Sequence, residues 1–221
     1  GIVYRANGYT PVPVSTDAIE YAISQWATLD DAIGYAYTQE GTPFYVLTSP
    51  SANETWAYDC KTRLWHQRAY LDPDTGNLTR HRGTCHALFN GAHLIGDNGE
   101  GLTNEGKILQ FNTEVYSDPT NEQKWLRSWR ALAQGTNNLK RTFQHTLQID
   151  IQAGVGISSG QGYNPTILLR WSDDGGHTWS NYHSASIGAQ GRYGTRAIFR
   201  RLGSTEKLRD RVYELSGTDP V

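Results

Sequence analysis

The stretch WSDDGGHTW, residues 171–179, does most to indicate the fold of this 221-residue chain. A strand-like run ends at this stretch and another follows it, so the chain must reverse direction within a few residues. Gly175 and Gly176 can adopt the positive φ angles of tight turns, which other residues rarely tolerate. The side chains of Ser172 and Asp174 can accept hydrogen bonds from turn amides. The stretch therefore predicts a β-hairpin turn.

The two adjacent carboxylates of this stretch, Asp173 and Asp174, also raise the question of catalysis. A glycosidase holds its two carboxylates on either side of a bond, roughly 5–9 Å apart. Neighbouring residues of a strand point to opposite faces, so these two aspartates are poorly suited to such a pair. A calcium loop would need alternating oxygen ligands and a later carboxylate, which the stretch lacks. The structural turn is the favoured interpretation.

The composition favours an all-β fold with frequent turns. Aromatic residues make up 11% of the chain and glycines number 23, whereas long apolar runs are missing. This combination is typical of short strands joined by glycine turns. No apolar run reaches the roughly 18 residues of a membrane-spanning helix. The opening residues GIVYRANGYT contain neither an initiator methionine nor a signal peptide, so we expect a fragment or processed piece of a longer protein.

One short helix is predicted near the N-terminus, at residues 15–26. Ser15, Thr16 and Asp17 are N-cap candidates, and Glu20 lies three residues after Asp17, which is the spacing of a capping box. Apolar residues follow at helical spacing, and we expect this stripe to pack in the core. The stripe comprises Ala18, Ile19, Ala22, Ile23 and Trp26.

From residue 32 onward, apolar residues alternate with polar ones, as in half-buried strands. Residues 71–83 are predicted as a loop, and residues 125–134 as a linker or bridging strand. After this point the strands are joined by glycine turns, and Leu147, Ile149 and Ile151 alternate as one buried face requires. The predicted strands are 32–39, 43–50, 54–59, 63–70, 84–91, 92–97, 107–116, 145–152, 166–174, 178–188, 194–203 and 209–217.

A loose repeat links three predicted hairpins. In the first, WAYDCKTRLW at residues 56–65, Asp59 is placed to close the turn and Trp65 follows on the returning strand. Asn112 takes the place of Asp59 in ILQFNTEVY, and WSDDGGHTW provides the third hairpin. The spacing is near the period of about 50 residues found in kelch-type propeller blades. We therefore predict propeller-like antiparallel hairpins in residues 1–125. A C-terminal antiparallel unit, sandwich-like or blade-like, follows in residues 126–221.

Residue types that carry enzyme chemistry are not arranged in any known motif. The chain has no zinc-binding HxxxH, no GxSxG and no phosphate loop, so we expect no catalytic residues, no cofactor and no metal. The histidines are predicted to be ordinary residues of a β-surface. Cys60 and Cys85 are predicted to be reduced and small core residues, and a bridge between them stays open because sequence does not give their separation.

Charge is distributed unevenly. Residues 1–120 contain 7 basic and 14 acidic residues, and residues 121–221 contain 13 basic and 8 acidic ones. A basic run near the C-terminus can contact DNA phosphates, or can be a solvated face or a subunit contact. The second interpretation is slightly favoured, because no aromatic stacking residues alternate with these basic ones. The run comprises Arg192, Arg196, Arg200, Arg201, Lys207, Arg209 and Arg211.

The hairpin turn resembles the Asp box of sialidases and other propeller proteins. The resemblance implies a structural turn remote from any catalytic residue. Together with the many tryptophans and tyrosines, it also supports an alternative function, that of a carbohydrate-binding or sialidase-like propeller protein. The matching residues are Ser172, Asp174, Gly176, Thr178 and Trp179.

Several stretches, in this order, resemble the C-terminal part of one family: the packaged-DNA stabilisation, or tail accessory (nozzle), proteins of short-tailed double-stranded-DNA phages. The stretches are GYTPVPVSTDAIEYAI (8–23), FYVLTSPSANETWAYDCKTRLWHQR (44–68), LIGDNGEG (94–101), LLRWSDDGGHTWS (168–180) and RDRVYELSGTDPV (209–221).

This resemblance implies a non-enzymatic protein of the virion, located in the phage tail and assembled in the cytoplasm of the bacterial host. It implies a six-fold ring below the portal and adaptor ring, with tail needle or spike proteins as further partners. Double-stranded DNA would pass through a channel in the ring. The implied role is closure of the DNA-filled head until ejection.

Overall fold

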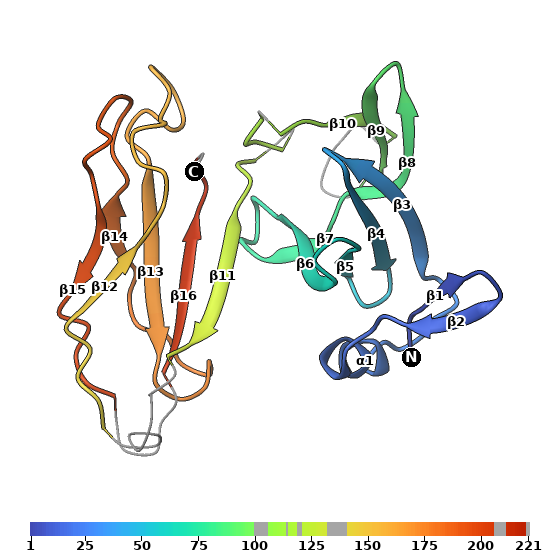
Figure 1. Ribbon diagram of the computed structural model, residues 1–221, viewed down its shortest axis with the longest axis horizontal. Coiled ribbons are helices and arrows are strands. Elements are labelled where there is room, and N and C mark those ends of the chain that lie inside the picture. Colours follow the sequence, from blue (N-terminus) through green and yellow to red (C-terminus); the bar gives the residue numbers. More distant parts are fainter. Residues whose placement is uncertain (100–105, 114, 119–120, 132–140, 206–210, 220–221) are drawn as a thin grey trace. The chain divides into compact units, whose positions relative to one another are not determined.

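The computed structural model describes residues 1–99, 106–113, 115–118, 121–131, 141–205 and 211–219 (Figure 1). The chain forms two compact units. The first comprises Gly1–Val115 and Pro119–Asn121, and the second comprises Tyr116–Asp118 and Glu122–Val221. The described residues form antiparallel sheets and one short helix, so the predicted all-β class is confirmed. That helix is too short to cross a membrane, and the described residues contain no candidate span.

The first unit consists of a hairpin, a helix and two antiparallel sheets. In each sheet the neighbouring strands are also neighbours in sequence. The five-stranded sheet has the order β3-β4-β5-β6-β7 and the three-stranded sheet the order β10-β9-β8. The elements are β1 (Tyr4–Asn7), β2 (Thr10–Pro13), α1 (Asp17–Ser24), β3 (Ile33–Gln39), β4 (Thr42–Ser49), β5 (Glu54–Asp59), β6 (Leu64–Leu71), β7 (Leu78–Arg80), β8 (Gly83–Phe89), β9 (Ala92–Asp97) and β10 (Ile108–Phe111).

Helix α1 begins after Thr16, but the expected capping box is not formed. The Thr16 side chain makes no capping hydrogen bond. The hydroxyl of Ser15 instead donates to Glu20 Oε1 at 2.8 Å and accepts the amide of Val3 at 3.2 Å. The side chains predicted to cap the helix thus tie its first turn to the N-terminal segment.

Both faces of the five-stranded sheet are covered by apolar side chains. On one face, Ile19, Ile23 and Trp26 of the helix region pack with residues that include Leu47 and Trp56. On the other face, a second cluster of Tyr37, Val46 and Ala57 packs with Tyr35, Phe44 and Phe111. The predicted apolar stripe therefore contributes to the core through three of its five members, because Ala18 is exposed and Ala22 only half-buried.

The prediction of a second copy of the hairpin, in residues 108–116, is wrong. Strand β10 ends at Phe111 rather than continuing to residue 116, and in the described residues it pairs with β9 alone. The next strand along the chain belongs to the second unit, so Asn112 does not begin a hairpin like that of Asp59. A short strand that was predicted as loop, β7, pairs with the end of β6.

The second unit is a β-sandwich. A four-stranded sheet has the order β11-β16-β13-β14, and a two-stranded sheet pairs β12 with β15 (Figure 1). The segment predicted as a linker or bridging strand contains β11, which pairs along its whole length with β16, so the strand alternative is correct for these residues. The strands are β11 (Trp125–Arg130), β12 (Thr146–Ile149), β13 (Thr166–Ser172), β14 (His183–Ser186), β15 (Ala197–Arg200) and β16 (Val212–Gly217).

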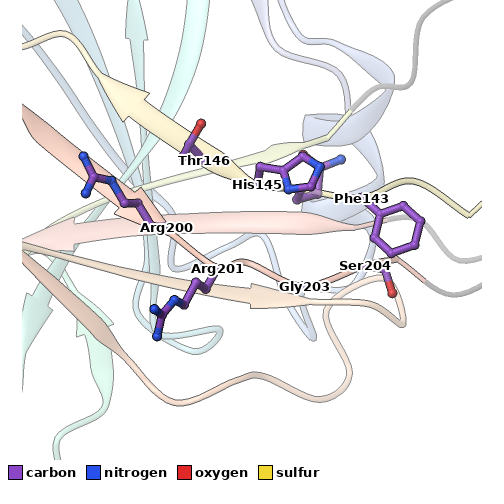
Figure 2. A pocket seen from close by; sticks show the side chains of 8 residues that line it. Phe143, His145, Thr146, Arg200, Arg201, Gly203 and Ser204 are labelled. Atoms are coloured by element: carbon purple, nitrogen blue, oxygen red, sulfur yellow. The ribbon is translucent and has the colours of Figure 1, made fainter.

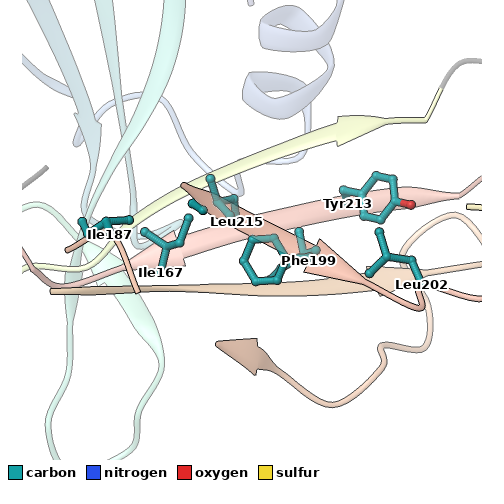
Figure 3. Close-up of a cluster of buried hydrophobic side chains, with 8 residues drawn as sticks. Ile167, Ile187, Phe199, Leu202, Tyr213 and Leu215 are labelled. Carbon is teal, nitrogen blue, oxygen red and sulfur yellow. The ribbon is translucent and has the colours of Figure 1, made fainter. Parts of the chain in front are cut away.

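The core of this unit lies between its two sheets. Ile167, Tyr213 and Leu215 of the larger sheet and Phe199 of the smaller one are buried in one cluster (Figure 3). Leu147, Ile149 and Ile151 pack against this cluster while the residues between them are exposed, which confirms the predicted alternation. The period of two in β13 and β16 therefore assigns one set of side chains to the core and the other to the outer face.

The two cysteines are free thiols. Cys60 is half-buried and Cys85 is exposed, so neither is the buried core residue that was predicted. Cys60 follows the last residue of β5, and Cys85 lies on β8, where the register with β9 shifts.

Candidate functional site

At the end of β13, Ser172 and Asp174 hold the following turn with their side-chain oxygens. Ser172 Oγ accepts the amide of Gly176 at 2.8 Å and donates its own proton to Asp174 Oδ1 at 2.6 Å. Asp174 also accepts the amides of His177 and Thr178, at 3.0 and 2.8 Å, and the Thr178 hydroxyl at 2.6 Å. Both carboxylate oxygens are thus engaged within the turn.

These hydrogen bonds determine what Asp174 can do chemically. The hydroxyls of Ser172 and Thr178, followed by the turn amides, hold the pKa of Asp174 well below its usual range. A general acid at neutral pH needs a raised pKa and a proton to give. Asp174 therefore has the character of a turn-closing carboxylate.

Replacing Asp174 with alanine should lower the melting temperature of the chain, because the turn amides lose their acceptor. Since the pKa is lower in the folded state, the stabilisation is present above about pH 4 and is lost as the pH falls towards the folded-state value. The difference between wild type and Asp174→Ala should therefore shrink in acid. Thermal melts followed by circular dichroism across this pH range test this. Asp174→Asn keeps an oxygen that accepts hydrogen bonds, so its melting temperature should fall less. An Asp174→Ala variant as stable as the wild type would show that these hydrogen bonds do not stabilise the fold.

The side chain of the adjacent Asp173 takes no part in the hydrogen bonds that hold the turn. It forms a two-pronged ion pair with Arg211, at 2.7 and 2.8 Å. Arg211 also donates to the carbonyls of Leu202 and Ser204, and its side chain is only 2% exposed. Arg211 was predicted as part of a surface for DNA or a subunit. This is wrong, because its guanidinium closes the end of the sandwich core.

Trp179 follows the turn and contacts a cation. It is half-buried and its ring stacks on the guanidinium of Arg170, with 4.5 Å between the guanidinium carbon and the ring centroid. Tyr182 lies 4.9 Å from the same guanidinium carbon. Arg170 in turn forms a two-pronged ion pair with Glu214 of the neighbouring strand, at 2.6 and 3.0 Å. The tryptophan thus covers an ion pair on the outer face of the sheet.

The corresponding turn of the first unit is closed by Asp59. Its Oδ1 accepts the amides of Lys61 and Thr62, at 2.7 and 3.1 Å. Trp65, on the returning strand, donates from Nε1 to the carbonyl of Val14 at 2.8 Å and packs against the cluster of helix α1. This hairpin therefore joins the sheet to the N-terminal segment.

The remaining basic residues lie apart from Arg211. Arg192, Arg196, Arg200 and Arg201 are exposed, whereas Lys207 and Arg209 lie outside the described residues. The last two exposed arginines line an open hollow of about 560 Å³ (Figure 2). Its lining consists of Phe143, Gln144, His145, Thr146, Arg200, Arg201, Gly203 and Ser204.

Pairing between distant parts of the chain forms this hollow. Thr146 of β12 pairs with Arg200 of β15, and Phe143 forms an isolated bridge with Ser204. The rings of Phe143 and His145 are stacked, with centroids 6.4 Å apart and an angle of 17° between their planes. Aromatic residues, which do not alternate with the basic ones in the sequence, are therefore brought beside the basic run from an earlier part of the chain.

The histidines of the first unit do not behave as ordinary surface residues. Arg68 of β6 lies over the rings of Tyr37, Phe44 and Phe111, at 5.4, 5.3 and 5.9 Å. Its Nε donates to His66 Nε2 at 3.3 Å. His86 and His93 lie in the same cluster, against Tyr37, and their Nε2 and Nδ1 atoms are 3.0 Å apart. Within the described residues, no group of three or more histidine, cysteine or acidic side chains is arranged to hold a metal.

His81, whose ring packs on Phe111, gives this cluster a pH dependence. Its Nδ1 accepts the amide of Gly83 at 3.0 Å. Burial, and then the charge of Arg68, lowers the pKa of His81 to about 4. In the unfolded chain a histidine has a pKa of about 6.5. As the pH falls, the unfolded state therefore binds the proton at a higher pH than the folded state does, and this binding favours unfolding.

We expect the first unit to lose stability as the pH falls from about 6.5 to 4. In His81→Asn this loss should be smaller, because the asparagine carbonyl can still accept the Gly83 amide but does not titrate over this range. Urea denaturation at several pH values, read by hydrogen exchange of β8 and β9, measures the effect. Identical pH profiles of the variant and the wild type would show that His81 is not the titrating group.

Comparison with known proteins supports a phage structural protein for this β-rich chain. Residues 124–221 match the family model described as Bacteriophage P22 Gp10, beta-sandwich. The matched range covers the β-sandwich of the second unit from β11 to the C-terminus. The predicted C-terminal sandwich is therefore confirmed, whereas none of the comparisons supports the sialidase-type assignment of the turn.

Two further comparisons add no functional information. No curated protein matches the chain. One similar solved structure is an exo-beta-1,3-galactanase from Phanerochaete chrysosporium with galactose, which is 10% identical. The similarity covers 85% of this chain but only about half (53%) of the galactanase, and the TM-score is 0.22. A value this low indicates neither a shared fold nor a shared activity.

Proposed function

We propose that the chain is a structural component of a phage tail, a tail accessory or nozzle protein that helps to close the DNA-filled head. The observation that carries the proposal is the match of residues 124–221 to the P22 Gp10 β-sandwich, which spans the sandwich as a whole. The ordered resemblance of stretches in both units to tail accessory proteins supports the same role.

The geometry of the hairpin turn supports a structural role over a catalytic one. Both carboxylate oxygens of Asp174 accept hydrogen bonds within the turn, and the carboxylate of Asp173 forms an ion pair with the guanidinium of Arg211. Neither carboxylate is left to act as the acid or nucleophile of a glycosidase. We therefore extend the proposal to a protein without catalytic activity, whose charged residues hold the sandwich together.

In the proposed assembly, copies of the chain form a six-fold ring that continues the DNA exit channel below the portal and adaptor proteins. The opposite charge balance of the two halves of the sequence suits contacts between unlike surfaces of neighbouring subunits. Exposed arginines such as Arg192 and Arg196 suit contact with DNA phosphates, which does not depend on base sequence.

The proposal is tested on purified particles of the phage that encodes the chain. Mass spectrometry should detect the protein in DNA-filled particles, and labelled antibodies should bind at the tail in electron micrographs. Labelling of the major capsid protein serves as the control, because it should cover the head instead. DNA-filled, infectious particles that lack the protein altogether would exclude a structural role in the tail.

A further inference from the structure

The hollow beside β15 contains an exposed aromatic surface. Phe143 is 69% exposed, and its ring is supported by the stacked imidazole of His145. An exposed aromatic ring is the surface on which proteins stack unpaired bases. In Figure 2 the rings of Phe143 and His145 lie towards one end of the hollow and the two arginine side chains towards the other.

The same hollow contains two consecutive arginines, Arg200 and Arg201. Within the described ranges, neither Arg200 nor Arg201 takes part in an ion pair. Arg201 has a positive φ of 61°, which is costly for a residue other than glycine. In a continuous strand these neighbours would point to opposite faces. The left-handed backbone at Arg201 ends this alternation, and both residues line the hollow.

From this arrangement we infer that the hollow binds unpaired nucleotides of a single-stranded nucleic acid. A base stacks on Phe143, and the phosphates next to it contact Arg200 and Arg201. A guanidinium presents a fork of N–H donors that fits the oxygens of a phosphate. The volume of about 560 Å³ lies in the range of small-ligand sites and accommodates one nucleotide.

Two features favour this ligand over other anions. Two consecutive arginines suit the successive phosphates of a nucleic acid, whereas a sialylated glycan carries one carboxylate per sialic acid. The ring of Phe143 adds a stacking contact that requires an unpaired base, because the bases of a duplex already stack on each other. Phosphate contacts alone would give no preference for single strands.

Fluorescence anisotropy with the 221-residue chain and a labelled oligothymidine of about 12 nucleotides tests the inference. Arg200→Glu/Arg201→Glu should weaken binding at least about ten-fold. It should also reduce the slope of log affinity against log salt by about 1.4, since each phosphate contact contributes about 0.7. Phe143→Ala should weaken binding by about ten-fold and leave the salt slope unchanged. A duplex of the same length should compete poorly.

The matched control is Arg5→Glu/Arg127→Glu, which changes the net charge equally at two exposed arginines that neither line the hollow nor belong to the basic run. It should retain most of the affinity, and circular dichroism melts should show all variants folded. Equal loss in both charge variants, no effect of Phe143→Ala, preferential competition by sialyllactose, or no binding at all would each overturn the inference. Because the binding is measured on the isolated chain, its failure would leave the proposed tail role unaffected.

Discussion

Asp97→Ala is expected to lower the free energy of unfolding of the first unit by about 3–5 kcal/mol, the usual cost of leaving one partner of a buried ion pair unpaired. The side chains of Arg82 and Asp97 are 3% and 0% exposed, and they form a two-pronged pair at 2.9 and 2.6 Å. Tyr70 covers the guanidinium at 4.9 Å. Without the carboxylate of Asp97, the positive charge of Arg82 would stay buried without the acidic group that now neutralises it.

The measurement is urea denaturation, with hydrogen exchange of β8 and β9 to report on the first unit. Asp97→Asn should cost less, because the amide oxygen can still accept one hydrogen bond. The double variant Arg82→Met/Asp97→Leu removes both charges and should recover most of the loss, since a buried pair contributes little net stability over an apolar one. If the double variant were as unstable as Asp97→Ala, an unpaired charge could not be the cause.

Asp173→Ala is expected to destabilise the sandwich by about 3 kcal/mol for the same reason. Arg211 is buried, and the carboxylate of Asp173, itself 26% exposed, is its ion-pair partner. The carbonyls of Leu202 and Ser204 would still accept its N–H groups, so hydrogen bonding is only partly lost. The charge, however, would remain without compensation at the end of the core.

Hydrogen exchange of β13 and β16 reads this loss directly. Asp150→Ala is the control, because Asp150 is exposed and such surface changes usually stay within about 0.5 kcal/mol. A loss after Asp173→Ala no larger than that of the control would show that the ion pair does not hold the sandwich together.

The local features of this fold could be predicted from sequence because they depend on neighbouring residues. Strands β5 and β9 have the predicted bounds, since alternation and the flanking turns define both ends. The hairpin turn between β8 and β9 places Asn90 and Gly91 at positive φ, which these residue types favour. Asp59 closes its turn through amides two and three residues further on.

Features that depend on distant residues could not be predicted in this way. The sequence left open whether β11 is a linker or a bridging strand, because its partner, β16, lies at the other end of the unit. Arg211 looked like a surface residue because Asp173 is 38 positions away in the sequence. The aromatic platform of the hollow was missed for the same reason, since Phe143 meets the basic run only through the pairing of β12 with β15.

The retention of packaged DNA tests the central claim, a structural role in closing the filled head, most directly. Phage particles assembled without this protein are compared with complete particles, and encapsidated DNA is measured by nuclease protection immediately after packaging and again after incubation. The proposed role predicts that heads lacking the protein fill normally and then lose their DNA, and that supplying the protein during assembly prevents the loss. Particles that lack the protein and keep their DNA as long as complete particles would contradict it.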